Sequence, residues 1–82
     1  MSGDYEWCLS RQAVERLIQF PPRRRRAMID RLDRWVKAPH RIKGENLTTP
    51  GGRKLLIVPH QGQIFTLYID DAVKRLEVLA LE

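Results

Sequence analysis

Cysteine is almost absent from this sequence, since Cys8 is the only one in 82 residues. A single cysteine excludes a disulfide within the chain and a zinc site built on several thiolates, and it is typical of a reducing cytoplasm. Cys8 falls within an alternating apolar pattern, so we expect a packed thiol. The sequence also lacks metal-ligand spacing and a glycine-rich phosphate loop, so we expect no metal and no cofactor.

Long apolar runs are missing as well. No stretch approaches the roughly 20 residues that span a bilayer, and the N-terminus lacks the basic-then-apolar pattern of a secretory signal. We therefore expect a cytoplasmic protein without membrane contact. A chain of this length allows one small core, so residues 1–82 are expected to form a single domain of marginal stability.

Acidic residues are scarce in the middle of the chain. Residues 11–43 contain eleven arginines and lysines against three acidic residues, and the whole chain has a net charge of +5. Arginine, which outnumbers lysine, suits bidentate contacts to phosphate. The favoured partner is therefore a nucleic acid or an acidic protein, and the alternative is a soluble basic surface with no specific partner.

The last third of the chain predicts a β-meander. Turn residues between its apolar runs leave only short connections, which force antiparallel pairing. Alternation places Phe65, Leu67 and Ile69 together on the face toward the helices. The three predicted strands are 53–58, 63–69 and 73–81.

The first half of the chain predicts the cover for this sheet. Residues 4–9 alternate as a strand, Ser10 caps a helix that runs to about Phe20, and Pro22 opens a second helix that ends near Ala38. The predicted fold class is α+β in two layers, with a helical hairpin packed on a four-stranded antiparallel sheet, in the order β-α-α-β-β-β. The expected buried stripes are Ala13, Val14, Leu17 and Ile18, then Met28, Ile29, Leu32, Trp35 and Val36. The expected ion pairs on the second helix are Arg26–Asp30, Asp30–Arg34 and Asp33–Lys37.

Residues 40–52 are mostly polar and predict a loop, with a short extra strand left open around residues 46–49. Leu47 is one of the few apolar residues in this segment and is expected to plug the core. His40 follows a helix end, where a cation is favourable, and Asp70-Asp71 are interpreted as turn residues.

Four consecutive arginines, 23–26, occupy the first turn of the second predicted helix. Cations there are unfavourable by about 0.3–1 kcal/mol each before screening, so helix stability does not explain them. Two interpretations remain open: a solvated run of charge, or a cluster that faces phosphate or an acidic partner.

A set of marker residues follows the predicted elements in order. They are Tyr5-Glu6-Trp7, a helix beginning near a serine, Ala38-Pro39, Asn46-Leu47, an Arg53-led strand, Gly62 in a hairpin and Leu67-Tyr68-Ile69-Asp70. In order and spacing, over nearly the whole chain, this pattern resembles the RelE/ParE superfamily of bacterial type II toxin–antitoxin systems.

The resemblance implies a RelE-like fold, with the first strand beside the last, and the function of a toxin that an acidic antitoxin inactivates. RelE-like members are mRNA interferases that cleave messenger RNA in the ribosomal A site and so inhibit translation, and this is the favoured expectation. The alternative is non-enzymatic: a ParE-like inhibitor of DNA gyrase, or a degenerate toxin that only binds its antitoxin.

The sequence departs from the family's catalytic pattern. RelE-like nucleases use an arginine on the middle meander strand and further groups in a tail, whereas here that strand begins Gln63-Ile64 and the sequence ends at Glu82. We therefore expect an incomplete catalytic set, and RNA cleavage that is weak or depends on groups outside that set. The weak catalytic candidates are Arg53, Lys54, His60 and Arg75.

The basic residues near strand starts and helix ends predict a phosphate-binding patch, for which edge protection by charge is the alternative. The predicted nucleic-acid-binding residues are Arg23, Arg24, Arg41, Lys43, Arg53, Lys54 and Lys74.

Overall fold

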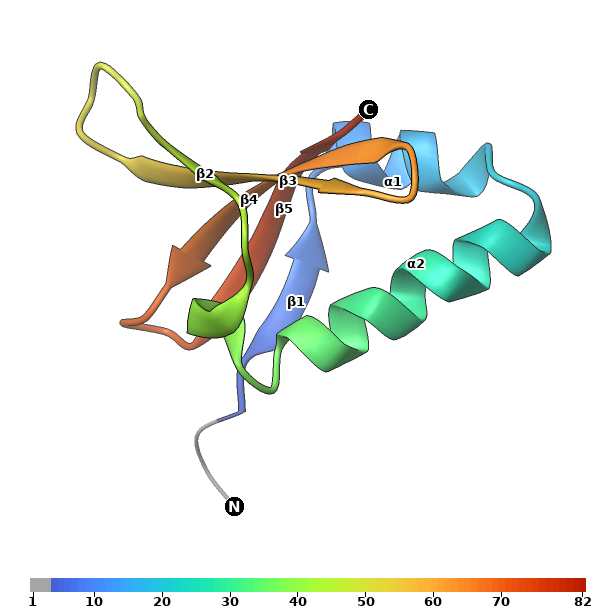
Figure 1. Cartoon of the computed structure of the whole chain (residues 1–82), viewed down its shortest axis with the longest axis horizontal. Coiled ribbons are helices and arrows are strands. Elements are labelled where there is room, and N and C mark those ends of the chain that lie inside the picture. The colour runs from blue at the N-terminus through green and yellow to red at the C-terminus, as the bar shows by residue number, and fades with distance from the viewer. Residues whose placement is uncertain (1–3) are drawn as a thin grey trace.

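Two helices lie on one side of a five-stranded sheet in the computed structural model, which describes residues 4–82 (Figure 1). Within these residues no helix is long and apolar enough to span a bilayer. The elements are β1 (Glu6–Leu9), α1 (Arg11–Ile18), α2 (Pro22–Trp35), the short 3₁₀ helix η1 (Pro39–Arg41), β2 (Glu45–Thr48), β3 (Lys54–His60), β4 (Gln63–Asp70) and β5 (Arg75–Leu81).

The sheet has the strand order β1-β5-β4-β3-β2 and is mixed. The predicted antiparallel meander of β3, β4 and β5 is confirmed. β1 lies beside β5, as the resemblance implies, but it runs parallel to it. Parallel pairing needs a long crossover, and the chain makes one through both helices before it returns to the sheet. The α+β, two-layer prediction therefore holds, with one strand more than expected.

The additional strand is β2, which forms within the predicted loop and pairs with β3 at the sheet edge. The prediction that Leu47 plugs the core is wrong, since 51% of this residue is exposed. Its partner in β3 is Leu55, one residue out of step with the inward-facing Leu56. Because side chains alternate along a strand, this register directs Leu47 to the face away from the helices.

β3 continues through Pro59, where the sequence predicts its end. The pairing with β2 stops at Ile57, so Pro59 lies beyond the last ladder bond on that side and its missing N–H is not needed there. Gln61 and Gly62 then turn the chain with positive φ angles of 51° and 79°. Positive φ at both central residues is the geometry that matches the twist of a two-residue hairpin.

The core lies between the helices and the sheet. The predicted inward face is confirmed, because Phe65 and Leu67 are almost fully buried, Ile69 packs against the core, and Ile64 is 47% exposed. The buried residues are Ala13, Leu17, Met28, Leu32, Val58, Phe65, Leu67, Leu76, Val78 and Leu81.

The predicted stripe of α2 is confirmed, whereas that of α1 is half wrong. Ala13 and Leu17 are buried, but Val14 and Ile18 are 41% and 61% exposed. The Gln12 amide explains this rotation, since it donates to the Leu81 carbonyl and accepts from the Leu81 N–H at 3.2 and 3.0 Å. The side of α1 that carries residues 12, 13 and 17 therefore faces β5, and the neighbouring positions turn outward.

The three ion pairs expected along α2 are not formed among the described residues, where the salt bridges are Arg11–Glu15 and His40–Asp71. Asp33 instead accepts a 2.8 Å hydrogen bond from the indole Nε1 of Trp7. This bond ties α2 to β1. Exposed pairs at i,i+4 contribute only about 0.3–0.5 kcal/mol, so a tertiary hydrogen bond competes with them easily.

Ser10 caps α1, as predicted, and also joins it to β5. Its hydroxyl accepts from Ala13 N at 3.1 Å and donates to the Leu79 carbonyl at 2.7 Å. Replacing it with alanine leaves both groups without this partner, so Ser10→Ala should lower the free energy of unfolding by about 0.5–2 kcal/mol. Urea denaturation measures this loss. Ser10→Thr, which keeps the hydroxyl, is the control, and equal midpoints for wild type and Ser10→Ala would contradict the prediction.

Candidate nucleic-acid cleft

A cleft of about 500 Å³ opens on the helix-facing side of the sheet. Here the segment 39–44, which includes η1, lies beside the strands where α1 and α2 do not reach. Its apolar floor includes Leu56 of β3 and the inward-facing Leu67 and Ile69 of β4. Its polar lining gathers side chains from η1, the loop after it, β2, β3 and the β4–β5 turn. These polar residues are His40, Lys43, Asn46, Lys54 and Asp71.

The local sequence explains how the segment 39–44 comes to line the cleft. Pro39 is buried and starts η1, and the Ile42 side chain packs against the core beyond its end. Gly44 then brings the chain close to β3, because a Cβ at this position would collide with the Ile57 carbonyl oxygen and with Cγ2 of Val58. Only glycine permits such a close backbone approach, so Gly44 fixes the start of β2 at the rim of the cleft.

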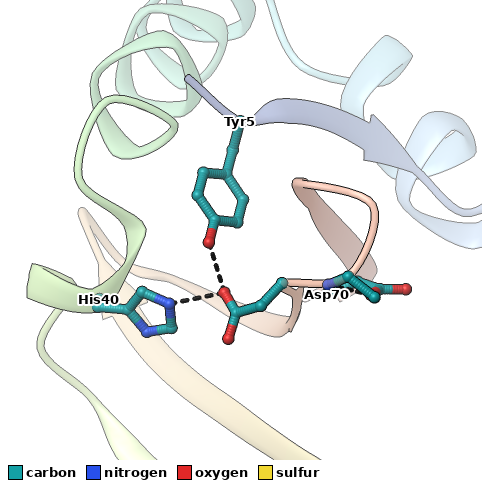
Figure 2. A network of polar contacts seen from close by, with 5 residues as sticks. Tyr5, His40 and Asp70 are labelled. Atoms are coloured by element: carbon teal, nitrogen blue, oxygen red, sulfur yellow. Dashed lines mark hydrogen bonds and ion pairs between the residues drawn. The ribbon is translucent and has the colours of Figure 1, made fainter. Parts of the chain in front are cut away.

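Three segments meet at one carboxylate beside this cleft (Figure 2). Tyr5, just before β1, donates its hydroxyl to Asp71 Oδ1 at 2.5 Å, and His40 Nε2 lies 2.7 Å from the same oxygen. The Tyr5 and His40 rings also meet edge to face, with centroids 6.2 Å apart. Asp70 contributes indirectly: its side-chain Oδ1 accepts from the backbone N–H of Ala72 at 3.2 Å and shapes the turn that presents Asp71.

The hydrogen bonds set the charge of this network. The bond from Tyr5, followed by that from His40, holds the pKa of Asp71 below its usual value, so the carboxylate is ionised at neutral pH. The same bond, with some burial, raises the pKa of Tyr5, which therefore stays a proton donor. Within residues 4–82 no group of three or more potential ligand side chains could hold a metal ion.

Two of the predicted basic residues, Lys43 and Lys54, line the cleft. The others lie outside it. Arg41 is exposed in η1, and Lys74, in the β4–β5 turn, holds its Nζ 5.3 Å from the Tyr5 ring centre. Lys54 and Lys43 are therefore the predicted phosphate-binding residues that the structure brings together.

Strand alternation separates Arg53 and Arg75 from the cleft. The Arg53 guanidinium stacks over Tyr68, 4.5 Å from the ring centre, on the sheet face away from the helices. Arg75 pairs in register with Glu6 of β1 on one side and Asp70 of β4 on the other. Neither arginine lines the cleft.

His60 lies at the other end of β3, roughly 20 Å from Lys54 at about 3.3 Å per residue. It is half-buried, and its ring meets those of Trp35 and Phe65 at centroid distances of 5.9 and 6.4 Å. Burial, with a contribution from the charge of Arg31, lowers the pKa of His60, so its ring is neutral and packed. A similar burial, with Glu77 nearby, raises the pKa of the half-buried Cys8 thiol.

The arginine run has structural partners. Arg24 donates to the Gln61 carbonyl at 2.8 Å and lies over the Phe20 ring. Arg25 donates to the carbonyl of Ile18, the last residue of α1, and to that of Phe20 just beyond it. A cation at a helix C-terminus is favourable, so Arg25 caps α1 although it belongs to α2. Arg23 is exposed.

Sequence reasoning missed three polar residues of the cleft: His40, Asn46 and Asp71. His40 and Asp71 are 31 positions apart, and Tyr5 and Asp71 are 66 apart. No local pattern links residues at such separations. The sequence did offer one signal for Asp71. A turn at this point needs a single carboxylate, which Asp70 provides, so the second aspartate is free for another role.

Comparison with solved structures identifies the architecture. A chain of the toxin–antitoxin complex RelBE2 from Mycobacterium tuberculosis superposes with a TM-score of 0.80 at 18% identity, covering 98% of both chains. A chain of the RelE–RelB complex from the archaeon Pyrococcus horikoshii gives 0.80 at 17%, covering 98% of this chain and 94% of that one. The chain has the RelE fold.

A third similar structure is the free Escherichia coli toxin RelE, in a form with two arginines replaced by alanine, with a TM-score of 0.69 at 14% identity. It covers 96% of this chain and 82% of that one. Neither a model of a protein family nor a curated protein matches the sequence. This chain therefore shares the RelE fold through the order and spacing of its helices and strands and its pattern of core residues, and not through close sequence identity.

Proposed function

We propose that this protein is the toxin of a type II toxin–antitoxin pair, and that it acts in the cytoplasm on ribosome-bound messenger RNA in the manner of RelE. The observation that carries the proposal is the superposition, over almost the entire length of both chains, with a chain of the RelBE2 toxin–antitoxin complex. The basic cleft on the same side as the helices is the feature through which this chain would act.

The cleft suits a single-stranded RNA segment. Lys43 and Lys54 supply cations for phosphate, and the Asn46 amide is able both to donate and to accept hydrogen bonds at a base edge. The apolar floor formed by Leu56, Leu67 and Ile69 offers a surface for a base. A net charge of +5 attracts a polyanion from a distance.

The opposite face of the sheet suits an acidic antitoxin. Leu47 and Ile64 are about half exposed there. A hollow of about 470 Å³ beside Ile64 is lined by Ile57, Pro59 and Ile64 together with Lys43 and Glu45. Exposed apolar groups on a small domain mark an interaction surface. We assign this face to an apolar segment of a partner of net negative charge, since the chain itself carries a net charge of +5.

Induced expression of the protein in bacteria should arrest growth, and co-expression of a short acidic protein encoded beside it should relieve the arrest and co-purify with it. Primer extension on ribosome-bound messages should show new 5′ ends at the A site during the arrest. Growth arrest without such cuts would contradict RNA cleavage and leave the toxin assignment intact. Normal growth at full expression would contradict both.

A further inference from the structure

His40 is placed as a proton acceptor in the cleft. Its Nε2 lies 2.7 Å from Asp71 Oδ1, and its ring lines the cleft beside Lys43 and Lys54. We propose that His40 is the general base for RNA cleavage and that Asp71 is the residue that orients it. This inference rests on the proposed function, and it names a base outside the catalytic set that the family resemblance implies.

The carboxylate selects the tautomer of His40. An ionised Asp71 only accepts hydrogen bonds, and one of its oxygens already accepts from the Tyr5 hydroxyl. Nε2 of a neutral His40 must therefore carry its proton, so the lone pair lies on Nδ1. Nδ1 makes no hydrogen bond to any residue in the range 4–82, and the side chain is 62% exposed, so a substrate can reach it.

The charged groups around His40 fit a base that works next to phosphate. Asp71 of the β4–β5 turn and Tyr5, just before β1, contact it, and Lys43 and Lys54 line the same cleft. Lys74, in the same turn as Asp71, holds its Nζ 5.3 Å from the Tyr5 ring centre. The carboxylate of Asp71 holds the ring through Nε2, so the opposite nitrogen, Nδ1, points away from it. The positive charges of Lys43 and Lys54 balance the negative charge that a phosphodiester brings into the cleft.

The cleavage step balances without any cofactor. Nδ1 of His40 takes the proton of a ribose 2′-hydroxyl, the 2′ oxygen forms a bond to the adjacent phosphorus, and the bond from phosphorus to the 5′ oxygen breaks. The leaving 5′ oxygen takes a proton from water, and the resulting hydroxide recovers the proton held by His40. The products are a 2′,3′-cyclic phosphate and a 5′-hydroxyl end.

Fold stability alone does not explain this arrangement. Asp71 already joins the β4–β5 turn to β1 through Tyr5, so the turn is anchored without His40. The His40–Asp71 pair is exposed on both sides, at 62% and 59%, and pairs of that kind contribute little to stability because water screens them.

The test uses purified protein with programmed ribosomes and measures kcat and KM for cleavage against pH for four variants. His40→Ala should lower the rate by about 10²–10⁴-fold, the typical contribution of a general base. Asp71→Asn should lower kcat less and leave KM nearly unchanged, because the base stays in the cleft but loses the carboxylate that orients it. Asp30→Asn, an exposed carboxylate of α2, and His60→Gln, in the packed ring cluster, should keep the wild-type profile.

Thermal melts of all four variants separate loss of folding from loss of chemistry. Cleavage by folded His40→Ala at the wild-type rate would overturn this inference and leave the proposed function standing. A kcat for Asp71→Asn equal to that of the wild type would overturn the orienting role of Asp71. Absence of cleavage by the wild type would overturn RNA cleavage as the proposed function, and the role of His40 with it.

Discussion

Replacing Phe65 with alanine should lower the free energy of unfolding by about 3–5 kcal/mol, enough to unfold much of a domain whose total stability is roughly 0.05–0.15 kcal/mol per residue. Phe65 is 1% exposed, its ring meets Trp35 of α2 edge to face at 5.1 Å, and its partners across the sheet are Val58 and Leu81. The substitution therefore empties space between both layers at once, and the rigid sheet cannot collapse into it.

Ile64→Ala is the matched control, one residue away on the same strand. Ile64 is 47% exposed on the opposite face, so its loss should change stability by less than about 1 kcal/mol. Urea or thermal denaturation with circular dichroism measures both. Equal losses for the two variants would show that the alternation along β4 does not define the core.

The strongly periodic parts of the fold were predictable from the sequence. Alternation at 63–69 identified the buried face of β4, and the spacing of Met28 and Leu32 identified that of α2. The errors arose where a long-range partner decided the outcome. Leu47 faces away from the core because β3 sets its register, and Val14 is exposed because the Gln12 amide binds the end of β5. Neither partner is visible in a local window.

The candidate site was less predictable, because residue type alone does not place a side chain. Arg24 and His60 looked free for substrate, but one binds a turn carbonyl and the other packs between aromatic rings. In the sequence, His40 was interpreted as a loop cation and Asp71 as a turn residue, but in the fold the two side chains form a hydrogen bond with each other. In both cases the chemistry depends on contacts between segments far apart in the sequence.

The neighbours Arg53 and Lys54 should give opposite results when each is replaced with alanine. Lys54 lines the cleft, whereas Arg53 stacks on Tyr68 across the sheet, because successive residues of a strand point to opposite faces. Lys54→Ala should lower A-site cleavage by about 10²–10³-fold, since it removes a charge aimed at the phosphate where negative charge develops. Arg53→Ala should cleave at nearly the wild-type rate.

Binding of single-stranded RNA across a salt series tests the same point without relying on cleavage. Each phosphate contact contributes about 0.7 to the slope of log affinity against log salt, so Lys54→Ala should flatten the slope by roughly that amount and Arg53→Ala should not. If instead Arg53→Ala flattens the slope while Lys54→Ala leaves it unchanged, the phosphate path runs over the face that carries Tyr68. The cleft would then lose its role as the RNA site, because a strand cannot present both side chains to one phosphate.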